Sequence, residues 1–355
     1  MLQSPAVCGH SRCVGELYAH IEARGAIANI PNIIRRKKRF RRTKALYRKR
    51  NTQISSHPPA RQTGESHERC TQTAYPARYS WEWFMKVAIV TLAIGGRYHD
   101  RWRAYCERGW TSYAAKHGFD LIVIDKPLDD TWRAAARSPA WQKCLILRPD
   151  IAGRYDRIIW LDSDILINAN SPSVIEGVSP EKIGATDMHT FPSVEEFRHM
   201  FTLLMQMAQS ANSGVAKTWQ TYLDPADWHA AWGLPRWGRS IVQTGVLVLC
   251  PRHHRALLEN VYFSYEDRGG EPMNYENRPL SFEIQKHNLL HVLDNRFNTL
   301  LLFLIMKRQM DLRRALMPFE CAELLKSTFD HGYFLHLAGL KDTIDEFLPQ
   351  LAEKA

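Results

Sequence analysis

Two aspartates, Asp162 and Asp164, stand one residue apart inside the otherwise apolar stretch IIWLDSDILI, residues 158–167. Charged side chains are costly to bury inside a strand, so the stretch needs an explanation. A strand end that turns into solvent would be one, and a metal site would be another. The order of the elements around the stretch helps to choose between them.

The chain before this stretch alternates between short apolar runs and helical patterns. KVAIVTL is rich in Val and Ile and leads to Gly95 and Gly96, and the later helical pattern stops at Gly118, a typical helix end. We expect strand, helix, strand, helix and strand at residues 86–92, 97–117, 119–125, 138–148 and 155–162. This order predicts a parallel sheet with crossover helices. Ligands bind at the carboxyl ends of such strands, where Asp162 and Asp164 would lie.

A carboxylate pair with this spacing can reach one divalent cation from a tight turn. Hard oxygen ligands suit Mg²⁺ or Mn²⁺, which keep positions for water and for substrate phosphates. Such a cation neutralises the charge of a nucleoside diphosphate leaving group. Because Asp-x-Asp also occurs by chance in turns, the pair alone does not establish the site.

The positive charge of the chain is concentrated in residues 1–84. The whole chain has a net charge of +10, but residues 1–84 contain 16 Lys and Arg against 5 Asp and Glu, and the remainder contains 31 against 32. Segment 35–50 (RRKKRFRRTKALYRKR) predicts a solvated, poorly ordered extension. It could contact nucleic acid or an anionic membrane, or residues 1–84 could reflect a mis-assigned start. Residues 85–355 are expected to form a single domain.

The rest of the composition is that of a globular protein, with 45% hydrophobic residues. No run of 18 apolar residues predicts a transmembrane helix, and no signal peptide is evident. Seven cysteines without metal-binding spacing fit a reducing compartment. We therefore expect a cytoplasmic protein, or one bound peripherally to a membrane.

Several segments, in order, resemble GT-A-fold glycosyltransferases. The similarity is to the galactosyl- and mannosyltransferases of the α-1,2-galactosyltransferase type (family 34), and to the glycogenin-like family 8 enzymes. Besides the first strand and YDRIIWLDSDILI, it rests on four segments: SPAWQKCLILRPD, VQTGVLVL (242–249), RPLSFEIQ (278–285) and FLHLAGLK (334–341). Gln243 replaces the family's usual Asn, and Asp342 stands where Pro is common.

The resemblance implies a Rossmann-like α/β fold, with a mixed, mainly parallel sheet and helices on both faces. It also implies a metal-dependent hexosyltransferase. Such an enzyme moves galactose, mannose or glucose from a UDP- or GDP-hexose to a glycan or other hydroxyl acceptor, with retention of configuration.

The resemblance also implies a role for individual residues. Mn²⁺ (or Mg²⁺) would be bound by Asp162, Asp164 and His336. The nucleotide sugar would be bound by Thr91, Lys143, Asp162, Gly339 and Lys341, and the substrate would lie near Gln243, Thr244 and Gly245. Gln285 and Glu283 are candidates to stabilise the transition state, although both could belong to an ordinary helical turn.

Three tryptophans, Trp228, Trp232 and Trp237, crowd together in PADWHAAWGLPRWGRS. Flat aromatic rings stack on sugars, so these residues predict an acceptor-binding surface. An apolar cluster beneath a long loop is an equally ordinary explanation.

Two other classes of function are alternatives to sugar transfer. One is a nucleic-acid-associated protein that binds through its basic arm. The other is a nucleotidyltransferase, which would need a Gly-rich basic loop after the first strand, and AIGGRYHDR is only a faint version of that loop. The donor sugar and the acceptor are not indicated, because a few variable loop side chains read them.

Overall fold

The computed structural model describes residues 85–210, 213, 216–268, 275–338 and 340. The basic segment 1–84, Gly339 and Lys341 lie outside these residues, so the predictions for them remain predictions.

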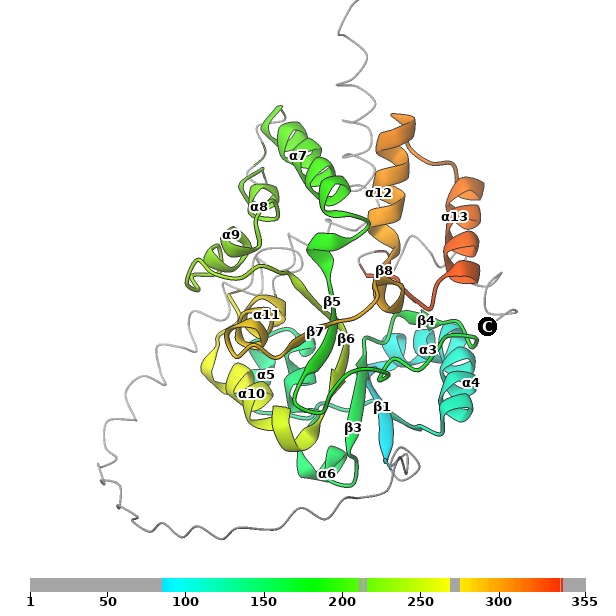
Figure 1. Ribbon diagram of the computed structural model, residues 1–355, viewed down its shortest axis with the longest axis vertical. Coiled ribbons are helices and arrows are strands. Elements are labelled where there is room, and N and C mark those ends of the chain that lie inside the picture. Colours follow the sequence, from blue (N-terminus) through cyan, green and yellow to red (C-terminus); the bar gives the residue numbers. More distant parts are fainter. Residues whose placement is uncertain (1–84, 211–212, 214–215, 269–274, 339, 341–355) are drawn as a thin grey trace, which may run out of the picture. The chain divides into compact units, whose positions relative to one another are not determined.

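A six-stranded sheet forms the centre of the fold, with the order β2-β1-β3-β6-β5-β7 (Figure 1). Its strands are β1 (Val87–Leu92), β2 (Asp120–Ile124), β3 (Arg157–Leu161), β5 (Ile183–Asp187), β6 (Val242–Leu249) and β7 (Leu290–Val292). The pairings β1–β2, β1–β3 and β5–β7 are parallel, whereas β6 runs antiparallel to both β3 and β5. The predicted fold class, α/β with a mixed and mainly parallel sheet, is confirmed.

Three further strands form a small second sheet with the order β4-β9-β8. They are β4 (Ile165–Ile167), β8 (Thr299–Leu300) and β9 (Phe334–His336). β4 follows the two aspartates directly and pairs antiparallel with β9, so that Ile165 lies opposite His336. This small sheet joins the IIWLDSDILI stretch to a strand about 170 residues later in the chain.

Helices connect these strands, and α10 and α11 lie on the opposite side of the main sheet from α3 and α4 in Figure 1. The α-helices are α3 (Gly96–Tyr105), α4 (Glu107–His117), α5 (Trp132–Ala135), α6 (Pro149–Ala152), α7 (Val194–Ser210), α8 (Ala216–Thr221), α9 (Pro225–Ala230), α10 (Pro251–Ser264), α11 (Asn277–Lys286), α12 (Leu301–Leu312) and α13 (Pro318–His331). The 3₁₀ helices are η2 (Pro139–Leu145), η3 (Met188–Thr190) and η4 (Asn295–Asn298).

The predicted strands and helices occur close to their expected positions, with two differences. The expected helix 97–117 is divided into α3 and α4 at Cys106, and it ends as predicted at Gly118, whose φ is 69°. The expected helix after Ser138 is the 3₁₀ helix η2, which begins where the Ser138 hydroxyl accepts a hydrogen bond from the Ala140 N–H. The tighter 3₁₀ turn is common in short connecting segments.

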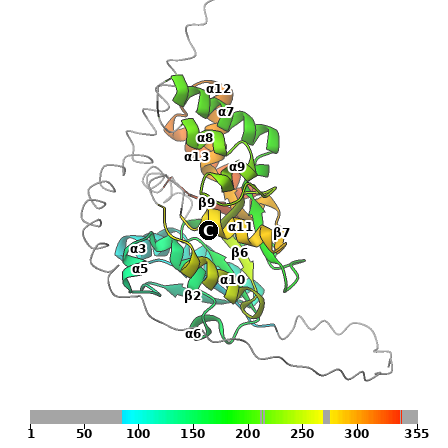
Figure 2. The ribbon, with the colours of Figure 1, turned by 90° about the vertical axis from the view of Figure 1, so that its left-hand side faces the viewer.

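The core explains why the central strands read as continuous apolar runs. Every residue of β3 and of β6 is buried, which requires cover on both faces of the sheet. One apolar cluster includes side chains of β1, β3, β6, η2, α10 and α11. A second cluster joins α7, α9 and α12, and α7, α12 and α13 stand near one another in both ribbon views (Figure 1 and Figure 2).

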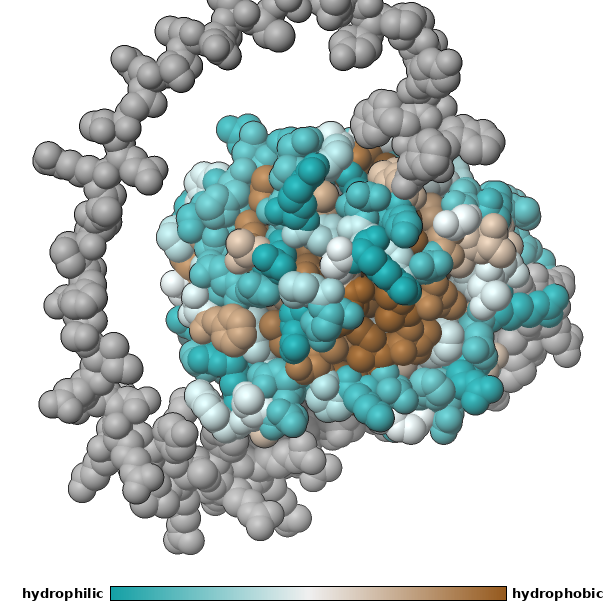
Figure 3. Space-filling model, turned by 90° about the horizontal axis from the view of Figure 1, so that it is seen from below, coloured by the Kyte–Doolittle hydropathy of each residue, from teal (hydrophilic) through white to brown (hydrophobic). Residues whose placement is uncertain are grey.

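Among the residues that the structure describes, no helix is both long and apolar enough to cross a membrane. The face shown in Figure 3 carries one continuous hydrophobic area bordered by hydrophilic residues.

Candidate metal centre

Asp162, Asp164 and His336 meet at the carboxyl end of β3. Asp162 follows β3, Asp164 precedes β4, and His336 is the last residue of β9. The His336 Nε2 atom lies 3.3 Å from Asp164 Oδ1 and 3.7 Å from Asp162 Oδ2. One ligand atom from each residue falls within 4.8 Å of the others. The three predicted metal ligands, which come from two distant segments, are therefore brought together.

Hydrogen bonds orient the His336 ring. Its Nδ1 atom lies 2.8 Å from Asn298 Oδ1. The Asn298 Nδ2 group donates to Gln243 Oε1 at 3.0 Å, so the Asn298 oxygen must face His336 as an acceptor. We infer that Nδ1 carries the proton and that the Nε2 lone pair faces the two carboxylates. A metal-binding histidine is commonly held in this way by its other ring nitrogen.

Asp162 is held through one of its two carboxylate oxygens. Oδ1 accepts hydrogen bonds from Lys143 Nζ at 2.9 Å and from Trp160 Nε1 at 3.1 Å. The Asp162 backbone N–H donates to the Gly245 carbonyl at 2.8 Å, which joins the end of β3 to β6. Oδ2 is the oxygen nearer to His336, and it would be the metal-binding atom.

Gly245 provides the space that the His336 ring occupies. A Cβ atom added at residue 245 would lie 2.8 Å from His336 Nδ1 and 2.9 Å from Gln243 Oε1. Real Cβ atoms essentially never approach other atoms so closely. A side chain at residue 245 would therefore collide with the imidazole of His336, and the predicted place of Gly245 beside the substrate remains a prediction.

Lys143 is buried behind Asp162 and joins it to a second carboxylate, Glu276. Its Nζ atom lies 2.8 Å from Glu276 Oε1, and Lys143 and Glu276 are 4% and 0% exposed. Burial disfavours the ammonium ion, but Asp162 and Glu276 outweigh this and raise the pKa of Lys143 above its ordinary value. Thr244 Oγ1 also lies 3.0 Å from Glu276 Oε1. Lys143 was expected to contact the nucleotide, but in this structure its ammonium group forms ion pairs with Asp162 and Glu276.

The three ligand atoms suit a hard or borderline divalent cation. Two carboxylate oxygens and one imidazole nitrogen are a donor set that favours Mn²⁺ over Mg²⁺, because Mg²⁺ prefers oxygen alone. The carboxylates are partly exposed while His336 is buried, so a bound ion would retain an open side toward solvent or substrate. The residues present therefore fit the predicted metal.

Glu283 and Gln285 are engaged elsewhere in the fold. The Glu283 carboxylate accepts hydrogen bonds from the hydroxyl of Tyr265 and from Lys286 Nζ. The Gln285 side chain binds the backbone of the loop before β6, accepting from the Arg239 and Ser240 N–H groups at 3.0 Å. None of these contacts joins either residue to Asp162, Asp164 or His336, and their catalytic role remains a prediction.

Thr91 and the three tryptophans also occupy separate surroundings. Thr91 is fully buried in β1 and offers no surface to a nucleotide. Trp228 and Trp232 are buried in different apolar clusters, and Trp237 is 47% exposed. The three tryptophans therefore do not form the single acceptor surface that their spacing suggested.

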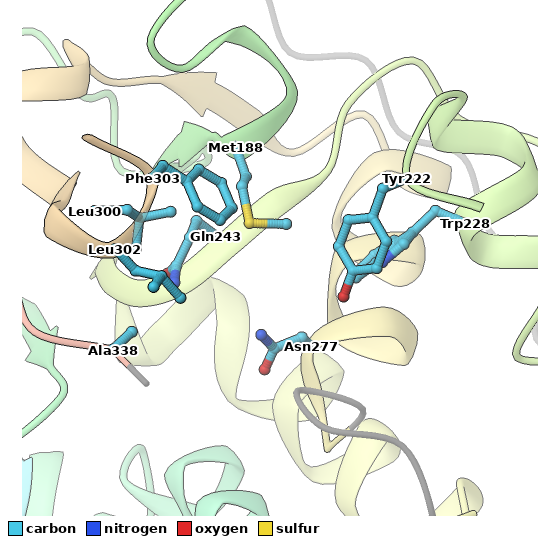
Figure 4. Close-up of a pocket in the computed structure, with 9 residues that line it drawn as sticks. All are labelled: Met188, Tyr222, Trp228, Gln243, Asn277, Leu300, Leu302, Phe303 and Ala338. Atoms are coloured by element: carbon cyan, nitrogen blue, oxygen red, sulfur yellow. The ribbon is translucent and has the colours of Figure 1, made fainter. Parts of the chain in front are cut away.

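A small pocket borders the metal centre, and Trp228 lines it together with Gln243 and Asn277 (Figure 4). Asn277 is the first residue of α11, and its Oδ1 atom lies 3.0 Å from Thr244 Oγ1. Sequence reasoning missed Asn277, Glu276 and Asn298. For Glu276 and Asn277, the available signal was an acidic residue followed by an amide residue at the start of α11.

Comparisons with known proteins give distant structural similarity. One is to a glycosyltransferase involved in the glycosylation of the major capsid of PBCV-1, with a TM-score of 0.45 and 12% identity over 76% of this chain and 100% of that one. Another is to the galactosyltransferase LgtC in complex with donor and acceptor sugar analogs, with a TM-score of 0.37 and 14% identity over 75% and 95%. No family model and no curated protein matches the chain.

Proposed function

We propose that this chain is a metal-dependent glycosyltransferase that moves a hexosyl group from a UDP- or GDP-hexose to a hydroxyl group of an acceptor. The observation that carries the proposal is the convergence of Asp162, Asp164 and His336, with His336 oriented by Asn298. The alternative of nucleic-acid binding gains no support, because the basic segment 35–50 lies outside the described residues.

A bound Mn²⁺ would neutralise the diphosphate and make it a better leaving group. In the transfer, the bond between the sugar C1 and the phosphate oxygen breaks, and a bond between C1 and the acceptor oxygen forms. With retention, the departing phosphate oxygen takes the proton of the acceptor hydroxyl on the same face of the sugar. No separate protein base is then required.

The residues of the chain would position this reaction. Lys143 and Trp160 hold the Oδ1 atom of Asp162, which leaves Oδ2 directed toward the ion. In place of Gln285, we propose the Asn277 side chain as the amide that contacts the reacting sugars, because it is partly exposed and lines the pocket beside the metal centre. Lys341, five residues after His336, remains a proposed ligand of the diphosphate.

The test is a screen of UDP- and GDP-hexoses with Mn²⁺ that measures release of the nucleoside diphosphate, with and without EDTA. We expect release from at least one donor, and loss of release with EDTA or with Asp164→Asn. Asp150→Asn is the matched control, since the Asp150 side chain is 60% exposed and its carboxylate contacts the Arg148 guanidinium. Release from no donor would refute sugar transfer, and equal activity of the two variants would refute the metal assignment.

A further inference from the structure

Two buried side chains at the start of α4 contact the turn that carries Asp164. The Trp110 Nε1–H donates to the Ile165 carbonyl at 2.7 Å. The Cys106 thiol donates to the Ser163 carbonyl, with 3.6 Å between the sulfur and the oxygen. In Figure 1, β4 lies beside α4, and the two elements pack against each other. Because Ser163 and Ile165 are the chain neighbours of Asp164, the start of α4 binds the backbone on both sides of a proposed metal ligand.

Strand β9 holds the backbone of Asp164 from the opposite side. The Leu337 N–H donates to the Asp164 carbonyl at 3.0 Å, and Ile165 lies opposite His336 in the antiparallel register of β4 and β9. Residues that exchange hydrogen bonds alternate along such a pair with residues that do not, so the Ile165 carbonyl faces away from β9. A buried carbonyl without a donor is costly, and Trp110 supplies the donor. The turn is therefore held between β9 and α4.

The break between α3 and α4 places both donors where they can reach this turn. Cys106 ends α3 and precedes α4, and Trp110 follows it by four residues, a spacing that puts the two side chains on the same face of a helix. Cys106 and Trp110 are 3% and 0% exposed, so water is not an alternative partner for either. The indole of Trp110 also packs edge to face on Trp102, with 5.8 Å between the ring centroids. The packing and the hydrogen bond together fix the orientation of the Trp110 ring.

The place of the Asp164 carboxylate depends on the position of this turn. Its Oδ1 atom lies 3.3 Å from His336 Nε2, and one ion can be bound by both residues only while they stay close together. A shift of the Ser163 or Ile165 carbonyl would move the Asp164 backbone, and with it the carboxylate. Groups that orient a metal ligand commonly determine the affinity for the metal although they do not touch the ion.

We propose that Trp110 and Cys106 are positioning residues of the metal centre, which hold the Asp164 carboxylate where it and His336 can bind one Mn²⁺ together. The proposal rests on the proposed function, since the ion is the one that would bind the nucleoside diphosphate. It assigns part of the affinity for the ion to two buried side chains of the α3–α4 junction that contribute no ligand.

The experiment measures Mn²⁺ binding to the full chain by electron paramagnetic resonance, without nucleotide or sugar. Trp110→Phe removes the donor to the Ile165 carbonyl but keeps an aromatic ring, and it should weaken Mn²⁺ binding about tenfold or more. Trp102→Phe is the matched control. Trp102 is 2% exposed and packs on Trp110, but its Nε1 donates to no group in the described part of the chain. This variant loses the same ring area without a hydrogen bond, so its Mn²⁺ affinity should stay within about twofold of the original.

Cys106→Ala and Cys106→Ser form a second, milder pair of variants. The serine hydroxyl can still donate to the Ser163 carbonyl, whereas alanine cannot, so the alanine variant should bind Mn²⁺ more weakly than the serine variant. Unfolding of each variant in urea shows whether it is folded under the conditions of the binding measurement. If Trp110→Phe does not fold, the two Cys106 variants decide the outcome.

Equal Mn²⁺ affinities of Trp110→Phe and Trp102→Phe would overturn the positioning role of Trp110, and equal affinities of the two Cys106 variants would overturn that of Cys106. The absence of Mn²⁺ binding by the unmodified chain would overturn the metal centre and the inference together. Weakened Mn²⁺ binding in Trp110→Phe, without nucleoside diphosphate release from any donor in the original screen, would reject sugar transfer and leave the positioning role. Release from a donor together with equal affinities would reject only the positioning role.

Discussion

Replacing Lys143 with methionine should destabilise the fold strongly, and a second substitution should reverse most of the loss. Lys143 Nζ lies 2.8 Å from Glu276 Oε1 and 2.9 Å from Asp162 Oδ1, in surroundings where Lys143 is 4% exposed and Glu276 is not exposed at all. Lys143→Met leaves the Glu276 carboxylate buried without its cation. Removing one partner of a buried ion pair costs about 3–5 kcal/mol, because the remaining charge cannot be solvated. Asp162 loses less, since its side chain is 29% exposed.

The double variant Lys143→Met with Glu276→Gln removes both charges of the buried pair. Its free energy of unfolding should return to within about 1–2 kcal/mol of the original, because a neutral pair needs no compensation. A double-mutant cycle in urea, with the m-value checked for constancy, measures the coupling between the two residues.

The control for this cycle is Lys326→Met, which removes an exposed ion pair with Asp330 on α13. Exposed pairs contribute roughly 1 kcal/mol or less, so little change is expected there. A cost below about 1 kcal/mol for Lys143→Met, or strictly additive effects in the double variant, would show that Lys143 does not compensate the buried charge of Glu276.

Three further predictions concern the metal centre and the pH dependence of stability. Gly245→Ala should displace the His336 ring and weaken Mn²⁺ binding measured by electron paramagnetic resonance, and unchanged binding would contradict the close packing of the two residues. Asn298→Ala should weaken Mn²⁺ binding about 10–100-fold by releasing the ring of His336, and affinity within twofold of the original would contradict that role. Burial lowers the pKa of His254 to about 4, so the unfolded chain takes up a proton at higher pH than the native protein. The free energy of unfolding should therefore fall by about 3 kcal/mol from pH 6.5 to pH 4 because of this residue. His254→Gln should make the free energy of unfolding, measured in urea at each pH, depend less steeply on pH. An unchanged dependence on pH would refute the assignment.

Much of the fold could be predicted because its central strands are short apolar runs with clear ends. Gly118 ends α4 and the Ser138–Pro139 pair begins η2, which are local signals that operate without the rest of the chain. The reversed direction of β6 carries no such signal. A strand buried on both faces reads the same in either direction, so only its pairing with β3 and β5 reveals that it is antiparallel.

The candidate site also contains some residues that the sequence could predict and others that it could not. Asp162, Asp164 and His336 were predicted because the resemblance aligned short motifs around them. Glu283 and Gln285 were also predicted from the resemblance, through the segment RPLSFEIQ, but one-dimensional spacing does not tell which turn of a helix faces the site. The structure shows that the first turn of α11, with Asn277 at its start, adjoins Thr244, whereas Gln285 lies near the other end and binds the loop before β6.

The Gln at position 243, a departure from the Asn that the resemblance led us to expect, has a specific function in the structure. Its Oε1 atom accepts a hydrogen bond from the Gly245 N–H in β6 and another from Asn298 in η4. The second bond directs the Asn298 oxygen toward His336 Nδ1, from which we infer that the ring carries its proton on Nδ1. The Nε2 lone pair is then left facing Asp162 and Asp164. Residues of β6, η4 and β9 therefore determine together which nitrogen would face an ion, so the proposed metal centre depends on Gln243 although Gln243 would contribute no ligand to it.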